Sequence, residues 1–226
     1  MVHQDDAGPC VFGEATRGAG HELVEWRPQD GAAPGGFDAA IVFGGAMHFD
    51  QEDEHPWLGQ EGVWIKSLLA DRVPTLGVCL GAEMLAHAAG WPVARLARSE
   101  IGWHDVELTP AAQSDPLLSA VPARFPALQW HSYAAEPPDE ATVLAVSPAC
   151  AQAYRVGERA WGIQFHAEVD SAAVEYWLDD GADGEDVREV SLDIEAERQR
   201  TWREIADWTD LGRTLCARFL EVAAAG

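Results

Sequence analysis

The chain is poor in basic residues. Only 15 of its 226 residues are lysine or arginine, against 38 aspartates and glutamates, and the formal charge is −23. Nucleic-acid binding draws much of its affinity from basic side chains that contact phosphates. The composition therefore argues against DNA, RNA and anionic membrane surfaces as partners.

Long hydrophobic runs are also missing. No uninterrupted apolar stretch approaches the roughly 20 residues that cross a bilayer. Residues 1–6 have neither the basic start nor the apolar segment of a secretory signal. We therefore expect a cytoplasmic protein that does not insert into membranes.

Cysteines are few and scattered. The four of them never show the C-x-x-C spacing of zinc ribbons or redox pairs. We expect free thiols, and interpret three as packing residues: Cys10, Cys150 and Cys216. No metal is expected either, because the charged loop that holds the candidate ligands is of a kind usually solvated; these ligands are His48, Asp50, Asp53 and His55.

A hydrophobic fraction of 47% in a chain of this length is enough for one sizeable core, and we expect a single domain over residues 1–226. The patterns predict strands at Phe37–Phe43 and Val73–Val78, each followed by a helix, at Pro56–Asp71 and Leu80–Ala89. This order is typical of an α/β fold with a parallel sheet and helices on its faces. The first strand of such a sheet looks truncated in the short segment before His21.

The remainder of the chain changes character twice. Residues 93–164 show short alternating segments punctuated by proline, which predict strands and turns. Beyond Glu168 the pattern is helical, at Ser171–Leu178 and then at Val187–Ala224, with an interruption expected at Trp208–Gly212.

The most informative motif is Gly77-Val78-Cys79-Leu80-Gly81, which follows an apolar run. It has the shape of a nucleophile elbow, in which small residues let a strand turn sharply into a helix and hold one side chain in a strained position. A thiol at a helix N-terminus is favoured as the thiolate. Cys79 is therefore the candidate nucleophile.

A second motif, Gln164-Phe165-His166-Ala167-Glu168, supplies the other groups that acyl transfer needs. His166 is the candidate base, and Glu168 reaches its other ring nitrogen if the chain bends between them. The N–H groups of Leu80 and Gly45 are candidate donors for an oxyanion, since a glycine lets the backbone approach the substrate closely.

The order of these motifs resembles the class I glutamine amidotransferases, in particular stand-alone members similar to the amidotransferase domain of GMP synthase. The resemblance covers nearly the whole chain and rests on six segments: Phe43–Met47, Asp53–Leu58, Leu76–Gly81, Gln129–Ser132, Ser147–Ala153 and Gly162–Glu168. It implies a flavodoxin-like, open, mostly parallel sheet with helices on both faces.

The resemblance also implies an activity. A Cys79–His166–Glu168 triad hydrolyses the side-chain amide of glutamine through a γ-glutamyl thioester, and the ammonia passes to a synthetase partner. Gly45 and Leu80 form the oxyanion hole, and the substrate contacts lie near three residues: Trp130, His131 and Ser132. The resemblance implies no metal or organic cofactor.

The chain departs from the family pattern at three positions. Glu83 stands where the family usually has glutamine; its charge would repel an α-carboxylate and attract an ammonium group, unless it is only a partly exposed helix former. Ser132 replaces a glycine and crowds a backbone that grips the substrate. Ala167 replaces a proline, which removes rigidity between His166 and Glu168.

The sequence therefore favours a thiol amidohydrolase that acts on glutamine or a γ-glutamyl compound through Cys79, releasing ammonia or an amine. One alternative is a γ-glutamyl-amine hydrolase that does not use glutamine, which Glu83 favours. Another is a binding or regulatory module that keeps the fold without catalysis, which Glu83 and Ser132 together motivate.

Overall fold

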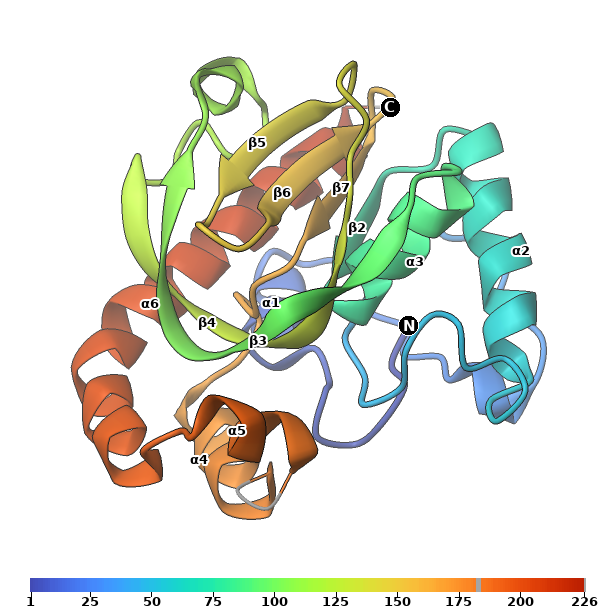
Figure 1. Ribbon diagram of the computed structural model, residues 1–226. Coiled ribbons are helices and arrows are strands. Elements are labelled where there is room, and N and C mark those ends of the chain that lie inside the picture. The colour runs from blue at the N-terminus through green and yellow to red at the C-terminus, as the bar shows by residue number, and fades with distance from the viewer. Residues whose placement is uncertain (182–183, 226) are drawn as a thin grey trace.

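A computed structural model of the chain describes residues 1–181 and 184–225. Within them, seven strands form one sheet in the order β1-β2-β7-β6-β5-β3-β4 (Figure 1). The strands are β1 Ala40–Val42, β2 Thr75–Val78, β3 Val93–Leu108, β4 Arg124–Ala135, β5 Thr142–Val146, β6 Ala151–Val156 and β7 Ala160–Ile163. The α-helices are α1 Cys10–Gly18, α2 Trp57–Ala70, α3 Leu80–Ala88, α4 Ser171–Asp180, α5 Glu185–Val190 and α6 Ile194–Ala224, with short 3-10 turns at Pro28–Asp30 and Pro110–Ser114.

The open α/β sheet expected from the sequence is confirmed, with its parallel pairing at one end. Strands β1, β2 and β7 run parallel, and β7, β6, β5, β3 and β4 pair with antiparallel neighbours. The antiparallel part corresponds to the alternating segments of residues 93–164. The parallel part carries the two motifs, since β2 ends at Val78 and β7 ends at Ile163.

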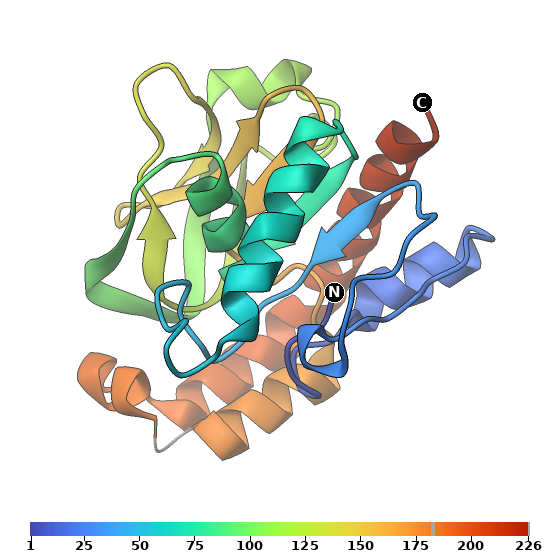
Figure 2. The same cartoon turned by 90° about the vertical axis from the view of Figure 1, so that its right-hand side faces the viewer.

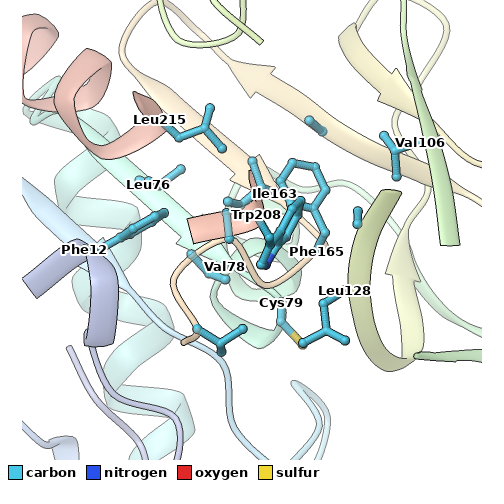
Figure 3. Close-up of a cluster of buried hydrophobic side chains, with 14 of the residues drawn as sticks. Phe12, Leu76, Val78, Cys79, Val106, Leu128, Ile163, Phe165, Trp208 and Leu215 are labelled. Carbon is cyan, nitrogen blue, oxygen red and sulfur yellow. The ribbon is translucent and has the colours of Figure 1, made fainter. Parts of the chain in front are cut away.

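Helices cover both faces of the sheet. In Figure 2 strand β1 lies between α2 on one side and α1 with α6 on the other. The larger buried cluster lies on the α1 and α6 side, where Phe12, Trp208 and Leu215 pack against Leu76 and the strands beside it (Figure 3). Cys79 belongs to this cluster, so the elbow is anchored in the core. A second, smaller cluster joins α2 and α3 to β1, through Leu58, Ile65, Leu85 and Val42 among others.

Helix α6 runs without a break from Ile194 to Ala224, so the interruption expected at Trp208–Gly212 is wrong. Gly212 is explained by a close backbone contact instead, because a Cβ at this position would lie 2.1 Å from the carbonyl oxygen of Ala167. Buried Leu215 and Phe219 hold the following turns against the core, so packing overrides the local helix-breaking tendency. None of the described helices has the length and apolar character needed to cross a bilayer.

Candidate active site

Cys79 stands at the sharp turn between β2 and α3. Its backbone has φ 52° and ψ −114°, a conformation that a residue with a side chain rarely adopts. Hydrogen bonds hold it there: its N–H donates to Ile163 O at 2.9 Å, and its carbonyl accepts from the N–H of Glu83 at 3.0 Å. The elbow expected from the sequence is therefore present.

The two glycines of the motif are explained by backbone contacts. A Cβ at Gly77 would lie 2.4 Å from Gly81 O, and one at Gly81 would lie 2.0 Å from Val42 O. Both distances are far below van der Waals contact. Helix α3 therefore starts this close to β1 and β2 only because these positions have no side chain.

His166 and Glu168 lie in the bend and turn that follow β7. The Nδ1 atom of His166 lies 2.7 Å from Oε1 of Glu168, and both side chains are almost fully buried. Because the carboxylate accepts, the proton of the neutral imidazole sits on Nδ1, which leaves the lone pair on Nε2. Among the described residues, Nε2 has no hydrogen-bond partner.

Gly44 brings the imidazole and the thiol together. A Cβ on Gly44 would lie 3.0 Å from Cε1 of His166 and 3.4 Å from the Cβ of Cys79. The ring and the thiol-bearing carbon therefore flank the same glycine, and both residues line one cavity. This is the arrangement in which a base accepts a proton from a nucleophile.

Burial sets the charge states of the site. It raises the pKa of Cys79, while the neighbouring His166 acts to lower it. This differs from the lowered pKa expected at a helix N-terminus, because desolvation outweighs the other effects. For His166, burial acts against the imidazolium, but Glu168 and Cys79 outweigh it and raise the pKa to about 10.

The two expected oxyanion donors lie beside Cys79. Gly45 and Leu80 both line the cavity, and neither backbone N–H has an acceptor in the described part of the chain. A Cβ at Gly45 would lie 2.5 Å from Sδ of Met47 and 3.2 Å from Cδ2 of Leu80. The glycine therefore lets this backbone come close to the start of α3, where two N–H groups are available to an oxygen.

A cavity of about 290 Å³ opens over the thiol. All four residues expected to contact substrate line it, namely Glu83, Trp130, His131 and Ser132. The thiol sulfur of Cys79 lies 3.9 Å from the backbone carbonyl of Trp130. The structure therefore brings Cys79, His166, the two candidate donors and these four residues to one cavity, with Glu168 in contact with His166.

The Ser132 hydroxyl is tied to helix α5. It donates a hydrogen bond to Asp186, whose other carboxylate oxygen accepts from Arg95 Nη2 at 2.9 Å and from Ser99 Oγ at 3.3 Å. The side chain that takes the place of a glycine thus fastens a neighbouring helix to β4. Hydrogen bonds from Ser132, Arg95 and Ser99 outweigh burial and lower the pKa of Asp186.

Glu83 is buried, with 3% of its surface exposed, so the interpretation as a partly exposed helix former is wrong. Its Oε1 accepts from Gln164 Nε2 at 3.4 Å. Burial raises its pKa to about 7 against the opposing effects of Gln164 and His166. The side chain therefore changes between a neutral and an ionised form near neutral pH.

Sequence reasoning missed the part of the cavity that α4 and α5 provide. These two helices contribute Tyr176, Trp177, Asp180 and Asp186 to the wall. The ring of Trp177 packs edge-on against His166, with centroids 4.7 Å apart. No motif marks these residues, which look like ordinary positions of amphipathic helices.

Comparison with known proteins gives the family. The model of the class I glutamine amidotransferases matches residues 15–179, and the chain belongs to this family. A glutamine amidotransferase from Thermotoga maritima has the same fold, with a TM-score of 0.86 and 26% identity over 97% of this chain and 95% of that one. The fold and the family that the sequence indicated are thus confirmed.

Two relatives match a shorter part of the chain than the family model does. The glutamine amidotransferase-like protein YfeJ of Salmonella typhimurium is 32% identical over 143 residues, 62% of this chain and 60% of that one. One of the subunits of the glutamine-hydrolyzing GMP synthase of Saccharolobus solfataricus is 31% identical over 136 residues, 59% of this chain and 68% of that one. The chain therefore spans about 60% of the length of YfeJ.

Proposed function

We propose that the protein is a thiol amidohydrolase that cleaves the side-chain amide of glutamine or of a γ-glutamyl compound. The family supports glutamine amide chemistry in general. The observation that carries the proposal is the 2.7 Å contact from His166 Nδ1 to Glu168, which leaves a buried, unpartnered Nε2 at the cavity of Cys79. A base oriented in this way is what a poorly ionised thiol requires.

The chemistry follows in two balanced steps. The sulfur of Cys79 attacks the side-chain carbonyl carbon as His166 Nε2 takes the thiol proton, and the oxyanion is stabilised by the N–H groups of Gly45 and Leu80. His166 then gives this proton to the departing nitrogen, which leaves as ammonia or an amine. A water molecule attacks the thioester, His166 takes its proton and returns it to sulfur, and the γ-carboxylate is released.

Burial raises the pKa of the Cys79 thiol, which favours base-assisted attack over a standing thiolate. Glu168 stabilises the imidazolium that forms when the proton moves to His166. Proton transfer and attack are thus coupled.

The test is release of the γ-carboxylate product from L-glutamine and from a panel of γ-glutamyl amides. Cys79→Ala should abolish turnover, whereas Cys10→Ser, which changes another free cysteine, serves as the matched control. Turnover that survives in Cys79→Ala would overturn the proposal. Absence of turnover with every substrate in the panel would favour the non-catalytic module.

A second candidate is a hydrolase specific for γ-glutamyl amides of amines. Among the described residues that line the cavity, the charged side chains are acidic, apart from the histidines, and none is a lysine or arginine; the acids are Asp6, Glu83, Asp180 and Asp186. Such a wall attracts a cationic leaving group more than a free carboxylate. The same substrate panel distinguishes the two candidate functions, because a higher kcat/KM for γ-glutamyl diamines than for glutamine favours this one.

We also propose a synthetase partner as the acceptor of ammonia, if glutamine is the donor. Support comes from the similarity to a protein that is named as one of the subunits of GMP synthase. With the partner present, glutaminase activity should rise and ammonia should no longer appear in solution. A pull-down with purified candidate synthetases, followed by the same assay, tests this.

A further inference from the structure

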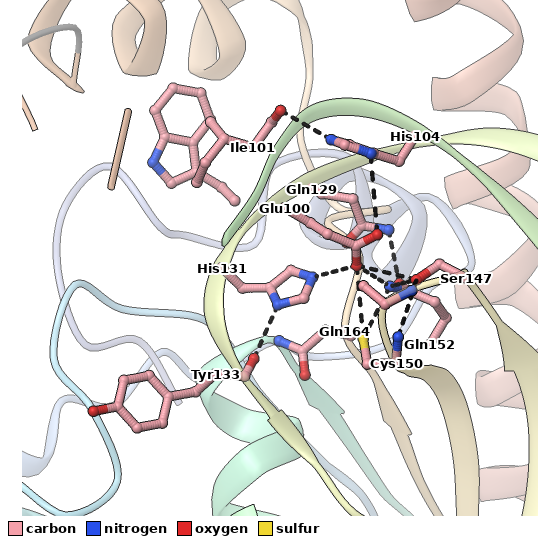
Figure 4. A network of polar contacts seen from close by, with 12 residues as sticks. Glu100, Ile101, His104, Gln129, His131, Tyr133, Ser147, Cys150, Gln152 and Gln164 are labelled. Carbon is pink, nitrogen blue, oxygen red and sulfur yellow. Dashed lines mark hydrogen bonds and ion pairs between the residues drawn. The ribbon is translucent and has the colours of Figure 1, made fainter. Parts of the chain in front are cut away.

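A second set of the same three residue types lies beside the active site, in the antiparallel part of the sheet. Glu100 of β3, His131 of β4 and Cys150 before β6 converge, and their ligand atoms all lie within 4.8 Å of one another (Figure 4). Glu100 Oε2 lies 3.3 Å from His131 Nε2 and 3.6 Å from Cys150 Sγ. The proposed proton transfers do not use this cluster, although His131 also lines the cavity of Cys79.

The hydrogen bonding of His131 is incomplete. Its Nδ1 lies 2.9 Å from the carbonyl oxygen of Tyr133, which can only accept, so the ring proton is on Nδ1. With Nδ1 as the donor to this carbonyl, Nε2 is the ring atom that faces the Glu100 carboxylate. The side chain is 1% exposed, and Nε2 makes no hydrogen bond to any residue that the structure describes.

Another buried histidine and glutamate pair shows that this is unusual. His3 also places Nδ1 against a backbone carbonyl, that of Gly44 at 2.9 Å. Its Nε2, however, makes hydrogen bonds to both oxygens of Glu61, at 3.1 and 3.2 Å. At His131 the second nitrogen instead lies near both a carboxylate and a thiol.

From this geometry we infer that Glu100, His131 and Cys150 form a binding site for a divalent transition-metal ion, with zinc as the best match. A tetrahedral zinc ion with bonds of about 2.0–2.3 Å separates neighbouring ligand atoms by roughly 3.3–3.7 Å. The distances of 3.3 and 3.6 Å from Glu100 Oε2 fall within this range. A mixed set of oxygen, nitrogen and sulfur ligands suits zinc, and a water completes the tetrahedron.

The surroundings have the features of a metal site. The histidine donates its other N–H to a backbone carbonyl, as metal-bound histidines usually do. Gln152 Nε2 donates to Glu100 Oε2 at 2.7 Å, and its own amide is oriented by Gln129 Nε2, also at 2.7 Å. Ser147 Oγ lies 3.2 Å from the same carboxylate oxygen. These contacts hold the carboxylate in place.

Metal binding displaces the thiol proton of Cys150, which leaves to solvent as the metal–sulfur bond forms. Cys150 is only half-buried, which provides a way in for the ion.

This site was not expected from the sequence, which favours packing as the purpose of Cys150. The site is next to the cavity of Cys79. His131 stands in β4 between Ser132 and Trp130, and the carbonyl oxygen of Trp130 lies near the Cys79 thiol. A metal here would fix the backbone of β4 at the substrate side. The inference does not depend on the proposed hydrolysis and is tested without an activity assay.

The first experiment titrates Co²⁺ into EDTA-treated full-length protein that carries Cys79→Ala, which removes the other Cys–His pair as a binding site. We expect a thiolate-to-cobalt charge-transfer band that saturates at one equivalent and is displaced by Zn²⁺. Cys150→Ser should remove the band, Cys10→Ser should keep it, and Gln152→Ala should weaken binding about 10–100-fold. No band, or a band unchanged by Cys150→Ser, would overturn the site.

A second measurement substitutes none of the three proposed ligands, so its result does not depend on whether such variants fold. Alkylation of each cysteine is followed by mass spectrometry in the Cys79→Ala protein, with and without Zn²⁺. Zinc should slow modification of Cys150 at least about tenfold and leave Cys10, the other half-buried cysteine, unchanged. Equal rates at Cys150 with and without zinc would contradict the proposal.

Discussion

The molecule holds two sets of cysteine, histidine and glutamate that differ in geometry. In the first set the groups form a line: Glu168 binds Nδ1 of His166, and Nε2 is left for Cys79. In the second, a backbone carbonyl occupies Nδ1 of His131, so the carboxylate, the Nε2 atom and the thiol meet at one point. We propose that the line passes a proton and that the convergent set binds a cation. Which nitrogen the carboxylate contacts therefore separates the two chemistries.

Replacing the glutamate of each set should give the largest contrast. Glu168→Gln removes the negative charge that keeps the proton on Nδ1 of His166 and stabilises its imidazolium, so kcat should fall about a thousandfold or more with KM little changed. Glu100→Gln should instead abolish the cobalt band and lower kcat far less. Steady-state kinetics and the Co²⁺ titration on both variants check this, and equal losses of kcat would remove the distinction.

A substitution at Gly44 tests the arrangement of Glu168, His166 and Cys79. In Gly44→Ala the new methyl would lie 3.0 Å from the His166 ring, so the imidazole has to shift and kcat should fall about a hundredfold. The control is Gly62→Ala in α2, where the nearest atom to the new carbon is 3.9 Å away. Metal binding should survive in both variants. A fully active Gly44→Ala would contradict the position given to His166.

The sequence predicted the first set of residues but not the second. Cys79 and His166 each follow a buried strand within a short motif, so local pattern and strand order bring them together. The second set comes from position 100 on β3, position 131 on β4 and position 150 just before β6, with no spacing signal. Its assembly depends on antiparallel register and on the irregular pairing between Arg95 and Glu100, neither of which local patterns determine.

Glu83 allows a prediction about pH. Burial raises its pKa from 4.5 to about 7, so it is mostly neutral at about pH 6 and mostly ionised at about pH 8. The ionised form repels the α-carboxylate of glutamine, and KM should rise about tenfold across this interval. In Glu83→Gln the KM should be flat and equal to the low-pH value of the parent, as a pH series of initial rates would reveal.

The same shift affects stability. Because the folded-state pKa is raised, the contribution of Glu83 is full below about pH 4.5 and is lost as the pH rises through about 7. The loss is of the order of 3 kcal/mol at most. Denaturant unfolding at both ends of the range should show a smaller pH dependence in Glu83→Gln, and an unchanged slope would argue against the buried carboxylate.

The smallest expected effect is at Ser132. Ser132→Gly restores the family residue and removes one hydrogen bond to Asp186, which stabilises the position of α5 by about 1 kcal/mol. KM for glutamine should change by about fivefold or less, while kcat and Co²⁺ binding stay the same. Isothermal substrate titration and kinetics measure this change. A large fall in kcat would instead give the hydroxyl a direct part in the reaction.

Helix α6 extends the active site beyond the stretch that identifies the family. The family match ends at residue 179, yet Trp208 Nε1 donates to the backbone carbonyl of His166 at 2.9 Å, and Gly212 presses against the carbonyl of Ala167. Helix α6 therefore supports the turn that carries His166 and Glu168. Residues of this helix should therefore change together with the turn at 166–168: a bulkier residue at position 212 would be tolerated only with a change in that turn.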